Sequence, residues 1–408
     1  MGNGAIALGA LAAGVNLVAG YPGTPSSEIL ETISKYRHDG VYIEWSVNEK
    51  AAMEVAAAAA YSGARAMVTM KQVGLNVAAD PLMSLAYVGV KGGMVIVSAD
   101  DPGPKSSQTE QDTRRFADFC RIPVFDPSSP EEAYKMIGDA FEYSEKYNTP
   151  VLFRPTTRVC HAYASIDNCD SPSPKKYEGF VKDSKKWVIF PRLSFANHIM
   201  IEKRNVEIGK DFSTYSANKA EGGNSAKAVV TSGISYAYTK ECLKDYPDVK
   251  LIKIATAYPF PEDFVLSSLE GAKEVLCIEE LSPFIEEQIL KLAGKHGLQL
   301  KVSGKLDGKV LAGGENSTDK IAAILGEFLG KDFTAEGYDL SDAPALPVRP
   351  PVLCAGCPHR ASFYAVKQAM KGRKAYFCGD IGCYTLGNAM PLDMVDTCLC
   401  MGAGITMA

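Results

Sequence analysis

Short apolar runs that alternate with helical segments restrict what the first 160 residues can fold into more than any other feature. Three of these runs, at 66–70, 94–98 and 151–154, have the length of strands that are buried on both faces. Between them lie helical segments such as the alanine-rich stretch 49–62. Strands that alternate with helices predict a parallel sheet with helices on both sides. The fold class that we expect is therefore α/β.

Changes in this alternation divide the 408-residue chain into segments. Residues 161–225 are polar and rich in Lys, Ser and Asn, which predicts a long connecting segment with a helix at 195–207. The alternation resumes over 226–335, which predicts a second, smaller α/β domain. Residues 336–351 are rich in proline and are expected to form a linker. A third α/β unit is expected over 352–408, and because it begins without finishing, we expect a truncated chain.

The charge balance and the apolar runs exclude several classes of protein. The chain carries 43 Lys and Arg against 48 Asp and Glu, a formal net charge of -5. Nucleic-acid phosphates are bound by clustered Lys and Arg, so we expect no nucleic-acid partner. No apolar run reaches the roughly 18 residues that a membrane helix needs. The N-terminus lacks the basic and apolar pattern of a secretory signal, which leaves a cytoplasmic location as the prediction.

A proline-rich turn at residues 21–26 follows the first apolar run. Its two prolines fix the backbone and present Thr24 at a strand end, and Ser26 or Ser27 can cap the helix that follows. Open α/β sheets bind ligands at this edge, and helix N-termini stabilise anions, so a carboxylate would suit Thr24. An ordinary strand-to-helix turn explains the same residues.

Three glutamates surround the next strand-to-helix transition. Glu44 is expected within the strand, Glu49 at the start of the alanine-rich helix and Glu54 further along it. A carboxylate that is held in an apolar site has a raised pKa and can share a proton with a ligand nitrogen. Glu49 would also stabilise a helix N-terminus without any ligand, and the two interpretations are equally supported.

Six of the eleven cysteines lie between residues 354 and 400. Cys354 and Cys357 have C-x-x-C spacing, His359 follows, and Cys383 lies downstream. Iron–sulfur clusters take four thiolates, zinc accepts three cysteines with a histidine, and a C-x-x-C pair can also be redox-active. Buried cysteines without any metal remain the alternative.

Six motifs, spread in order along the chain, resemble the 2-oxoacid:ferredoxin oxidoreductases, and in particular the large subunit of their indolepyruvate branch. They are residues 21–28 (YPGTPSSE), 48–54 (NEKAAME), 70–81 (MKQVGLNVAADP), 98–103 (SADDPG), 354–360 (CAGCPHR) and 379–387 (GDIGCYTLG). The resemblance implies a pyrimidine-binding thiamine diphosphate domain at 1–160 and a transketolase C-terminal-like domain at 226–335. It implies the start of a diphosphate-binding domain at 352–408.

The same resemblance implies roles for particular residues. Glu49 would hydrogen-bond the pyrimidine nitrogen of thiamine diphosphate, and Thr24 would contact the substrate, which makes these two the expected catalytic residues. Other expected cofactor-binding residues are Tyr21, Pro22, Gly23, Gln72, Asn76, His359, Gly379, Asp380 and Gly382. Cys354, Cys357 and Cys383 match three ligands of an iron–sulfur cluster.

The reaction that the resemblance implies is oxidative decarboxylation of aryl 2-oxoacids, such as indolepyruvate or phenylpyruvate, to aryl-acetyl-CoA. The expected cofactors are thiamine diphosphate, Mg²⁺ and [4Fe-4S] clusters. The expected partners are a smaller beta subunit, ferredoxin and coenzyme A, with two copies of this chain in a hetero-oligomer. A non-oxidative thiamine diphosphate enzyme and an inactive metal-binding fragment are the alternatives.

The sequence departs from the family pattern at two places. Pyruvate-acting relatives place an arginine in the polar loop at 99–110, where this chain has Asp100 and Asp101, which leaves recognition of the substrate carboxylate unexplained. The magnesium-binding motif is expected beyond Ala408, and Gly379-Asp380 is not that motif. For the chain as given we therefore predict little or no turnover.

Overall fold

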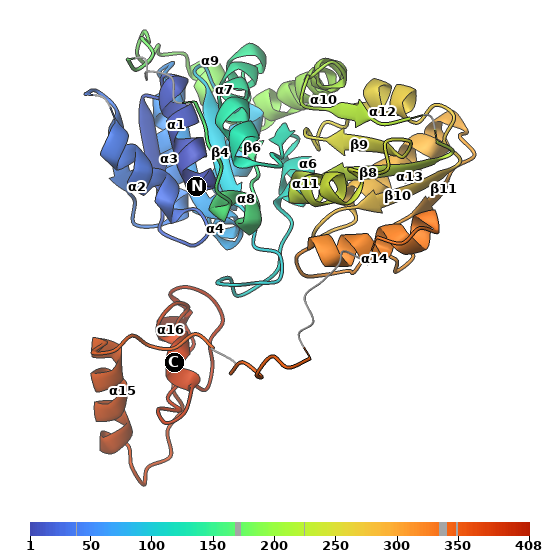
Figure 1. The fold of residues 1–408 in the computed structure, drawn as a ribbon. Helices are drawn as coiled ribbons and strands as arrows, with labels where there is room; N and C mark the ends of the chain where they lie inside the picture. Colours follow the sequence, from blue (N-terminus) through green and yellow to red (C-terminus); the bar gives the residue numbers. More distant parts are fainter. Residues whose placement is uncertain (38, 168–172, 224, 334–340, 348–349) are drawn as a thin grey trace. The chain divides into compact units, whose positions relative to one another are not determined.

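The structure is a computed structural model that describes all residues except 38, 168–172, 224, 334–340 and 348–349 (Figure 1). It divides into two compact units, Met1–Ala335 and Glu336–Ala408. Residues 336–340 and 348–349 of the expected linker lie outside the described residues.

The first sheet of the larger unit has six strands, which pair in parallel in the order β2-β1-β3-β4-β6-β5. The strands are β1 (Leu17–Gly20), β2 (Tyr42–Trp45), β3 (Ala66–Lys71), β4 (Met94–Ala99), β5 (Val124–Phe125) and β6 (Val151–Phe153). The helices are α1 (Gly2–Ala12), α2 (Ser27–Tyr36), α3 (Glu49–Tyr61), α4 (Gln72–Val77), α5 (Ala79–Val88), α6 (Thr113–Cys120), α7 (Pro130–Tyr147) and α8 (Thr157–His161).

Apolar side chains cover both faces of this sheet, as the sequence predicts. Val18 of β1 packs in a cluster with residues of α1, α2 and α7, whereas its neighbour Ala19 packs in a second cluster with residues of α3 and α5. Successive strand residues point to opposite faces, so both sides of β1 are buried. This burial explains the continuous apolar runs, and the expected parallel α/β fold is confirmed.

The connecting segment carries a longer helix than the one expected at 195–207. It contains α9 (Ser184–Trp187) and α10 (Pro191–Ser213). Ile208 and Phe212 extend the apolar face of α10 and are fully buried in the cluster on the α1 and α7 side of the first sheet. The helix therefore continues because its last turns pack against the sheet.

The second sheet of this unit has the order β11-β10-β8-β9-β7, in which only β7 runs antiparallel to its neighbour. Its strands are β7 (Lys219–Glu221), β8 (Lys227–Ser232), β9 (Lys250–Ile254), β10 (Glu274–Ile278) and β11 (Lys301–Ser303). Its helices are α11 (Gly233–Cys242), α12 (Glu262–Ser268), α13 (Phe284–His296) and α14 (Thr318–Leu329). Figure 1 shows the two sheets beside each other within the unit.

The smaller unit differs from the α/β unit that the sequence predicts. It contains α15 (Pro358–Ala369), the 3-10 helix η1 (Thr385–Asn388) and α16 (Ala403–Thr406). Among its described residues, strand-like pairing is limited to one bridge between Cys378 and Thr397. Its buried apolar cluster consists of Leu353, Phe363 and Met394, which is too small to cover a sheet. The expectation of strands here is wrong for the described residues.

No described helix combines the length and the apolar character that crossing a bilayer requires.

Candidate functional site

Four neighbouring strands of the first sheet end at the same edge, because β2, β1, β3 and β4 are adjacent and parallel. The chain leaves this edge through Glu49 after β2, the turn at 21–26 after β1, Lys71 at the end of β3 and a polar loop at 100–111 after β4. We call this last segment the β4–α6 loop. In open α/β sheets, ligands bind beyond the carboxyl ends of the strands. The candidate site is at this edge.

Glu49 is the first residue of α3, which begins there because the Asn48 side chain accepts a hydrogen bond from the Ala51 amide at 2.8 Å. Only 4% of Glu49 is exposed. Gly74 of α4 faces the carboxylate so closely that a Cβ at this position would lie 2.5 Å from Glu49 Oε1. Burial raises the pKa of Glu49, and attraction to Lys71 offsets this only in part. The expected buried carboxylate with a raised pKa is therefore present.

The turn at 21–26 presents Thr24 with its side chain exposed. The Ser27 hydroxyl accepts a hydrogen bond from the Gly23 amide at 2.8 Å, and the Ser26 hydroxyl donates to the Gly23 carbonyl at 3.1 Å. The Asn3 side chain donates to the Pro25 carbonyl at 2.6 Å and ties the turn to α1. Neither serine side chain caps α2, because both hydroxyls close the turn instead. The expected side-chain cap is wrong, and the expected presentation of Thr24 is confirmed.

The β4–α6 loop is folded around Asp101. One oxygen of Asp101, Oδ2, accepts hydrogen bonds from the amides of Lys105, Ser106 and Ser107 at 2.9, 3.0 and 3.1 Å. The other oxygen accepts from the Thr157 hydroxyl at 2.8 Å. The Ser106 hydroxyl then donates to the Thr24 carbonyl at 3.0 Å, so the loop is held against the turn at 21–26.

Gln72, expected to bind the cofactor, is fully buried and its amide is bonded to this loop. Its Nε2 donates to the Thr109 carbonyl at 2.8 Å, and its Oε1 accepts from the Asp101 amide. Because both ends of the amide have protein partners, Gln72 positions the loop. Asn76 lies exposed on the same helix, α4. Of the other expected residues in this part, Tyr21 is half-buried and Pro22 is exposed.

The remaining expected cofactor residues belong to the smaller unit. The Asp380 carboxylate accepts hydrogen bonds from the amides of Ile381, at 2.7 Å, and Gly402, at 2.9 Å, so it stabilises local backbone. A Cβ at Gly379 would lie 2.5 Å from Val395 Cγ1, and Gly382 has a φ of 119°. His359 Nδ1 lies 3.2 Å from Cys357 Sγ.

The three expected cluster ligands are also in the smaller unit. Cys354 and Cys357 form a turn, which the Cys357 amide closes onto the Cys354 carbonyl at 3.2 Å with Gly356 at a φ of 72°. Cys354 and Cys383 are exposed thiols. Within the described residues, no three His, Cys, Asp or Glu side chains are arranged to hold a metal ion. Thiolates are the ligands that a cluster takes, but this arrangement does not bring three ligands together.

Sequence reasoning assigned no role to Lys71 or Gly74, although both lie within a recognised motif. Lys71 could have been found from its place at the carboxyl end of a buried strand, where ligand-binding residues gather. No sequence pattern could give the contact of Gly74, because Glu49 approaches it from a different helix.

Residues 8–219 match the family described as pyruvate flavodoxin/ferredoxin oxidoreductase, thiamine diphosphate-binding. This match covers more than half of the chain, and the chain therefore belongs to that family. The motif resemblance to 2-oxoacid:ferredoxin oxidoreductases is confirmed.

Two curated relatives of the same name resemble the chain over nearly its whole length. Indolepyruvate oxidoreductase subunit IorA of Thermococcus kodakarensis is 42% identical over 420 residues, which cover 99% of this chain and 64% of that protein. The subunit of the same name from Pyrococcus horikoshii is 40% identical, with coverage of 100% and 65%. The chain thus spans just under two thirds of the length of these curated relatives.

A solved structure supports the fold. The 2-oxoglutarate:ferredoxin oxidoreductase of Magnetococcus marinus superposes with a TM-score of 0.61 at 17% identity. The superposition covers 80% of this chain and 64% of that one.

The residues at the carboxyl edge of the first sheet fit thiamine diphosphate, the cofactor of the family. A buried carboxyl group with a raised pKa can share a proton with a ring nitrogen, and Glu49 is such a group. The glycine opposite it leaves room for that carboxyl. When bound, thiamine diphosphate supplies a nucleophilic carbon that adds to a 2-oxo group and takes up the electrons that decarboxylation releases.

Proposed function

We propose that this chain carries the thiamine diphosphate-activating site of an enzyme that oxidatively decarboxylates aryl 2-oxoacids, such as indolepyruvate and phenylpyruvate. The acyl group passes to coenzyme A, and the electrons pass to ferredoxin. The names of the two indolepyruvate oxidoreductase relatives support indolepyruvate as the substrate. The proposal of a thiamine diphosphate-activating site rests on one observation, the buried carboxyl group of Glu49 at the carboxyl edge of the first sheet.

The two expected catalytic residues have separate tasks in this proposal. Glu49 holds a proton toward a ring nitrogen of the cofactor, and its raised pKa keeps that proton available. Thr24 offers a hydroxyl to the substrate at the neighbouring strand end. The turn that carries Thr24 is fixed by Ser27, Asn3 and Ser106, so the hydroxyl is presented on rigid backbone.

The remaining components of the proposed enzyme follow from the family. They are Mg²⁺, [4Fe-4S] clusters, with Cys354, Cys357 and Cys383 as candidate ligands of one of them, a smaller beta subunit, and a second copy of this chain. Residues 1–160, 226–335 and 352–408 are proposed as the pyrimidine-binding, transketolase C-terminal-like and diphosphate-binding parts. We place the enzyme in the cytoplasm, where free thiols stay reduced, and the ten described cysteines are free.

The test is an assay of the holoenzyme under argon, with indolepyruvate, coenzyme A and a redox dye. Replacing Glu49 by Gln keeps the shape but removes the acidic proton, and we expect kcat to fall about 100-fold or more with an unchanged circular dichroism spectrum. Glu54→Gln is the matched control, because Glu54 is exposed on the same helix. Its kcat should stay within about twofold of wild type.

Two results would contradict the proposal. Near wild-type turnover of Glu49→Gln would remove the role of that carboxyl. Release of an aldehyde without dye reduction would instead identify a non-oxidative thiamine diphosphate enzyme.

A further inference from the structure

Lys71 lies in the middle of the candidate site. It is the last residue of β3 and precedes α4, between the turn at 21–26 and the β4–α6 loop. Its aliphatic stem packs against Gly23, where a Cβ would lie 3.1 Å from Lys71 Cδ. Its Nζ donates a hydrogen bond to the Ser106 carbonyl at 3.2 Å. The ammonium group is thereby placed between the turn that carries Thr24 and the loop that bonds the Thr24 carbonyl.

Lys71 differs from three other cations around the β4–α6 loop, each of which is engaged by a carboxylate. These pairs are Arg154 with Asp100 and Asp126 at 2.7 and 3.2 Å, Lys105 with Glu315 at 3.2 Å, and Arg158 with Glu315 at 2.6 Å. Over the described ranges of the chain, Lys71 Nζ has no carboxylate oxygen within 4.0 Å and bonds only the Ser106 carbonyl. Two of its three N–H donors are therefore free for a ligand.

The two nearest acidic residues do not satisfy this ammonium group. Both oxygens of Asp101 are already bonded to loop amides and to Thr157. The carboxyl of Glu49 is packed against Gly74. Burial lowers the pKa of Lys71, even though attraction to Asp101 and Glu49 acts in the opposite direction. A cation that is partly dehydrated and lacks a contacting anion gains more from an anionic ligand than an exposed lysine does.

We propose that Lys71 binds the carboxylate of the 2-oxoacid substrate, with its two free N–H donors directed at that group. This inference rests on the proposed function and deepens it, since it names the group that recognises the one charge shared by all 2-oxoacids. Thr24, on the adjacent strand end, is then left for the 2-oxo oxygen. Lys71 would determine acid recognition and not the choice of aryl group.

The first experiment compares Lys71→Met with wild type in the holoenzyme. Methionine keeps much of the stem that packs on Gly23 but removes the charge. We expect the KM for phenylpyruvate to rise at least tenfold, while kcat at saturation changes about threefold or less. Lys71→Arg restores the charge and should recover at least part of the affinity. Lys50→Met is the matched control, because Lys50 is a partly exposed lysine that pairs with Asp80 and Glu54.

The second experiment needs no turnover and measures binding of unreactive analogues by calorimetry. Wild type should bind 3-phenylpropanoate at least tenfold more tightly than the neutral 3-phenylpropanamide. Lys71→Met should bind the two compounds equally, whereas Lys50→Met should keep the preference. Equal preference in wild type and Lys71→Met would overturn the inference. A wild-type enzyme that prefers the carboxylate, loses this preference in Lys71→Met and oxidises no 2-oxoacid would overturn the proposed function, and Lys71 would still be the residue that binds the carboxylate.

Discussion

The site depends on an empty space at Gly74 as much as on the carboxyl group that occupies it. Atoms Oε1, Cγ and Cδ of Glu49 would lie 2.5, 2.7 and 2.9 Å from a Cβ at this position. Cβ atoms do not come this close to other atoms, so any other residue must displace Glu49. Gly74 therefore sets the direction in which the carboxyl points.

Gly74→Ala tests this dependence. We expect the added methyl group to push the Glu49 carboxyl out of place and to weaken thiamine diphosphate binding at least tenfold, measured by calorimetry. The overall fold should persist, because the change is one methyl group beside a side chain at the sheet edge.

Gly4→Ala in α1 is the matched control. A Cβ there would meet no atom within 4 Å, and alanine in a helix is expected to add about 0.5–1 kcal/mol of stability. Equal cofactor affinity for Gly74→Ala and wild type would show that Glu49 tolerates a neighbouring methyl group.

At the scale of elements, α4 holds the β4–α6 loop through one side chain. The Gln72 amide bonds the Asp101 amide and the Thr109 carbonyl, two points on either side of the loop. The loop also contacts the second sheet domain, because Glu110 Oε1 accepts from the Gly314 amide at 2.6 Å. The loop that borders the candidate site is therefore held by both α4 and a segment after β11.

Gln72→Ala removes both bonds and leaves two backbone groups without partners. We expect the free energy of unfolding to fall by about 1–3 kcal/mol and trypsin to cleave faster after Lys105, an exposed residue of the loop. Asn76→Ala removes an exposed amide from the same helix and should change neither quantity. Cleavage of Gln72→Ala at the wild-type rate would mean that the contacts of Asp101 and Glu110 hold the loop without Gln72.

The sequence predicts the elements whose signal is local. The run Glu274–Ile278 is apolar and coincides with β10, because a strand buried on both faces needs no information from its neighbours. The edge strands β7 and β11 were missed. Each has three residues and carries lysine, and each forms only by pairing with the strand beside it.

The same distinction applies to the site. The position of Glu49 after a strand and before an apolar helix is visible in the sequence, and so is the exposed Thr24 in its proline-rich turn. The engaged amide of Gln72 and the unpaired ammonium group of Lys71 are not, because both depend on how the β4–α6 loop folds back over α4. Contacts between segments that are distant in sequence decide which polar groups stay free for a ligand.

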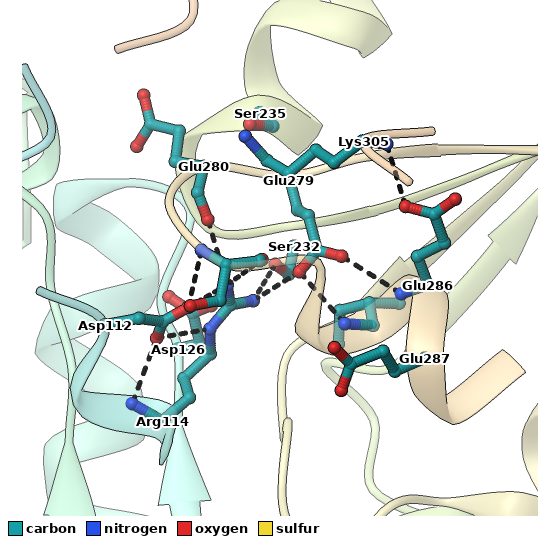
Figure 2. A network of polar contacts seen from close by, with 12 residues as sticks. Asp112, Arg114, Asp126, Ser232, Ser235, Glu279, Glu280, Glu286, Glu287 and Lys305 are labelled. Atoms are coloured by element: carbon teal, nitrogen blue, oxygen red, sulfur yellow. Dashed lines mark hydrogen bonds and ion pairs between the residues drawn. The ribbon is translucent and has the colours of Figure 1, made fainter. Parts of the chain in front are cut away.

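At the scale of the larger unit, a buried network of charges joins the two sheets. Arg114, at the start of α6, pairs with Asp112 at 2.7 Å and with Glu279, after β10, at 2.8 Å. Figure 2 shows these residues together. Arg114 is fully buried, and it also donates to the Glu280 carbonyl at 2.9 Å. The side chain of Glu280 accepts a hydrogen bond from the Asn316 backbone amide, at 2.8 Å through Oε1.

Burial raises the pKa of Glu280 from 4.5 to about 7, against the attraction of Arg154. Between these values the folded protein keeps a proton on Glu280 that the unfolded chain has released. Because only the unfolded chain gains from ionising Glu280 in this range, the loss of stability is absent below about pH 4.5 and grows until about pH 7.

Glu280→Gln removes this dependence, because an amide keeps the acceptor for Asn316 and never ionises. We expect the difference in free energy of unfolding between Glu280→Gln and wild type, measured in urea, to be about 1–3 kcal/mol larger at pH 8 than at pH 5, in favour of the variant. Glu270→Gln changes an exposed carboxylate and should show a difference from wild type that is the same at both pH values. If Glu280→Gln also differed from wild type by the same amount at pH 5 and pH 8, Glu280 would be ionised at no cost in the folded protein. The charge network would then compensate the burial of the Glu280 carboxylate in full.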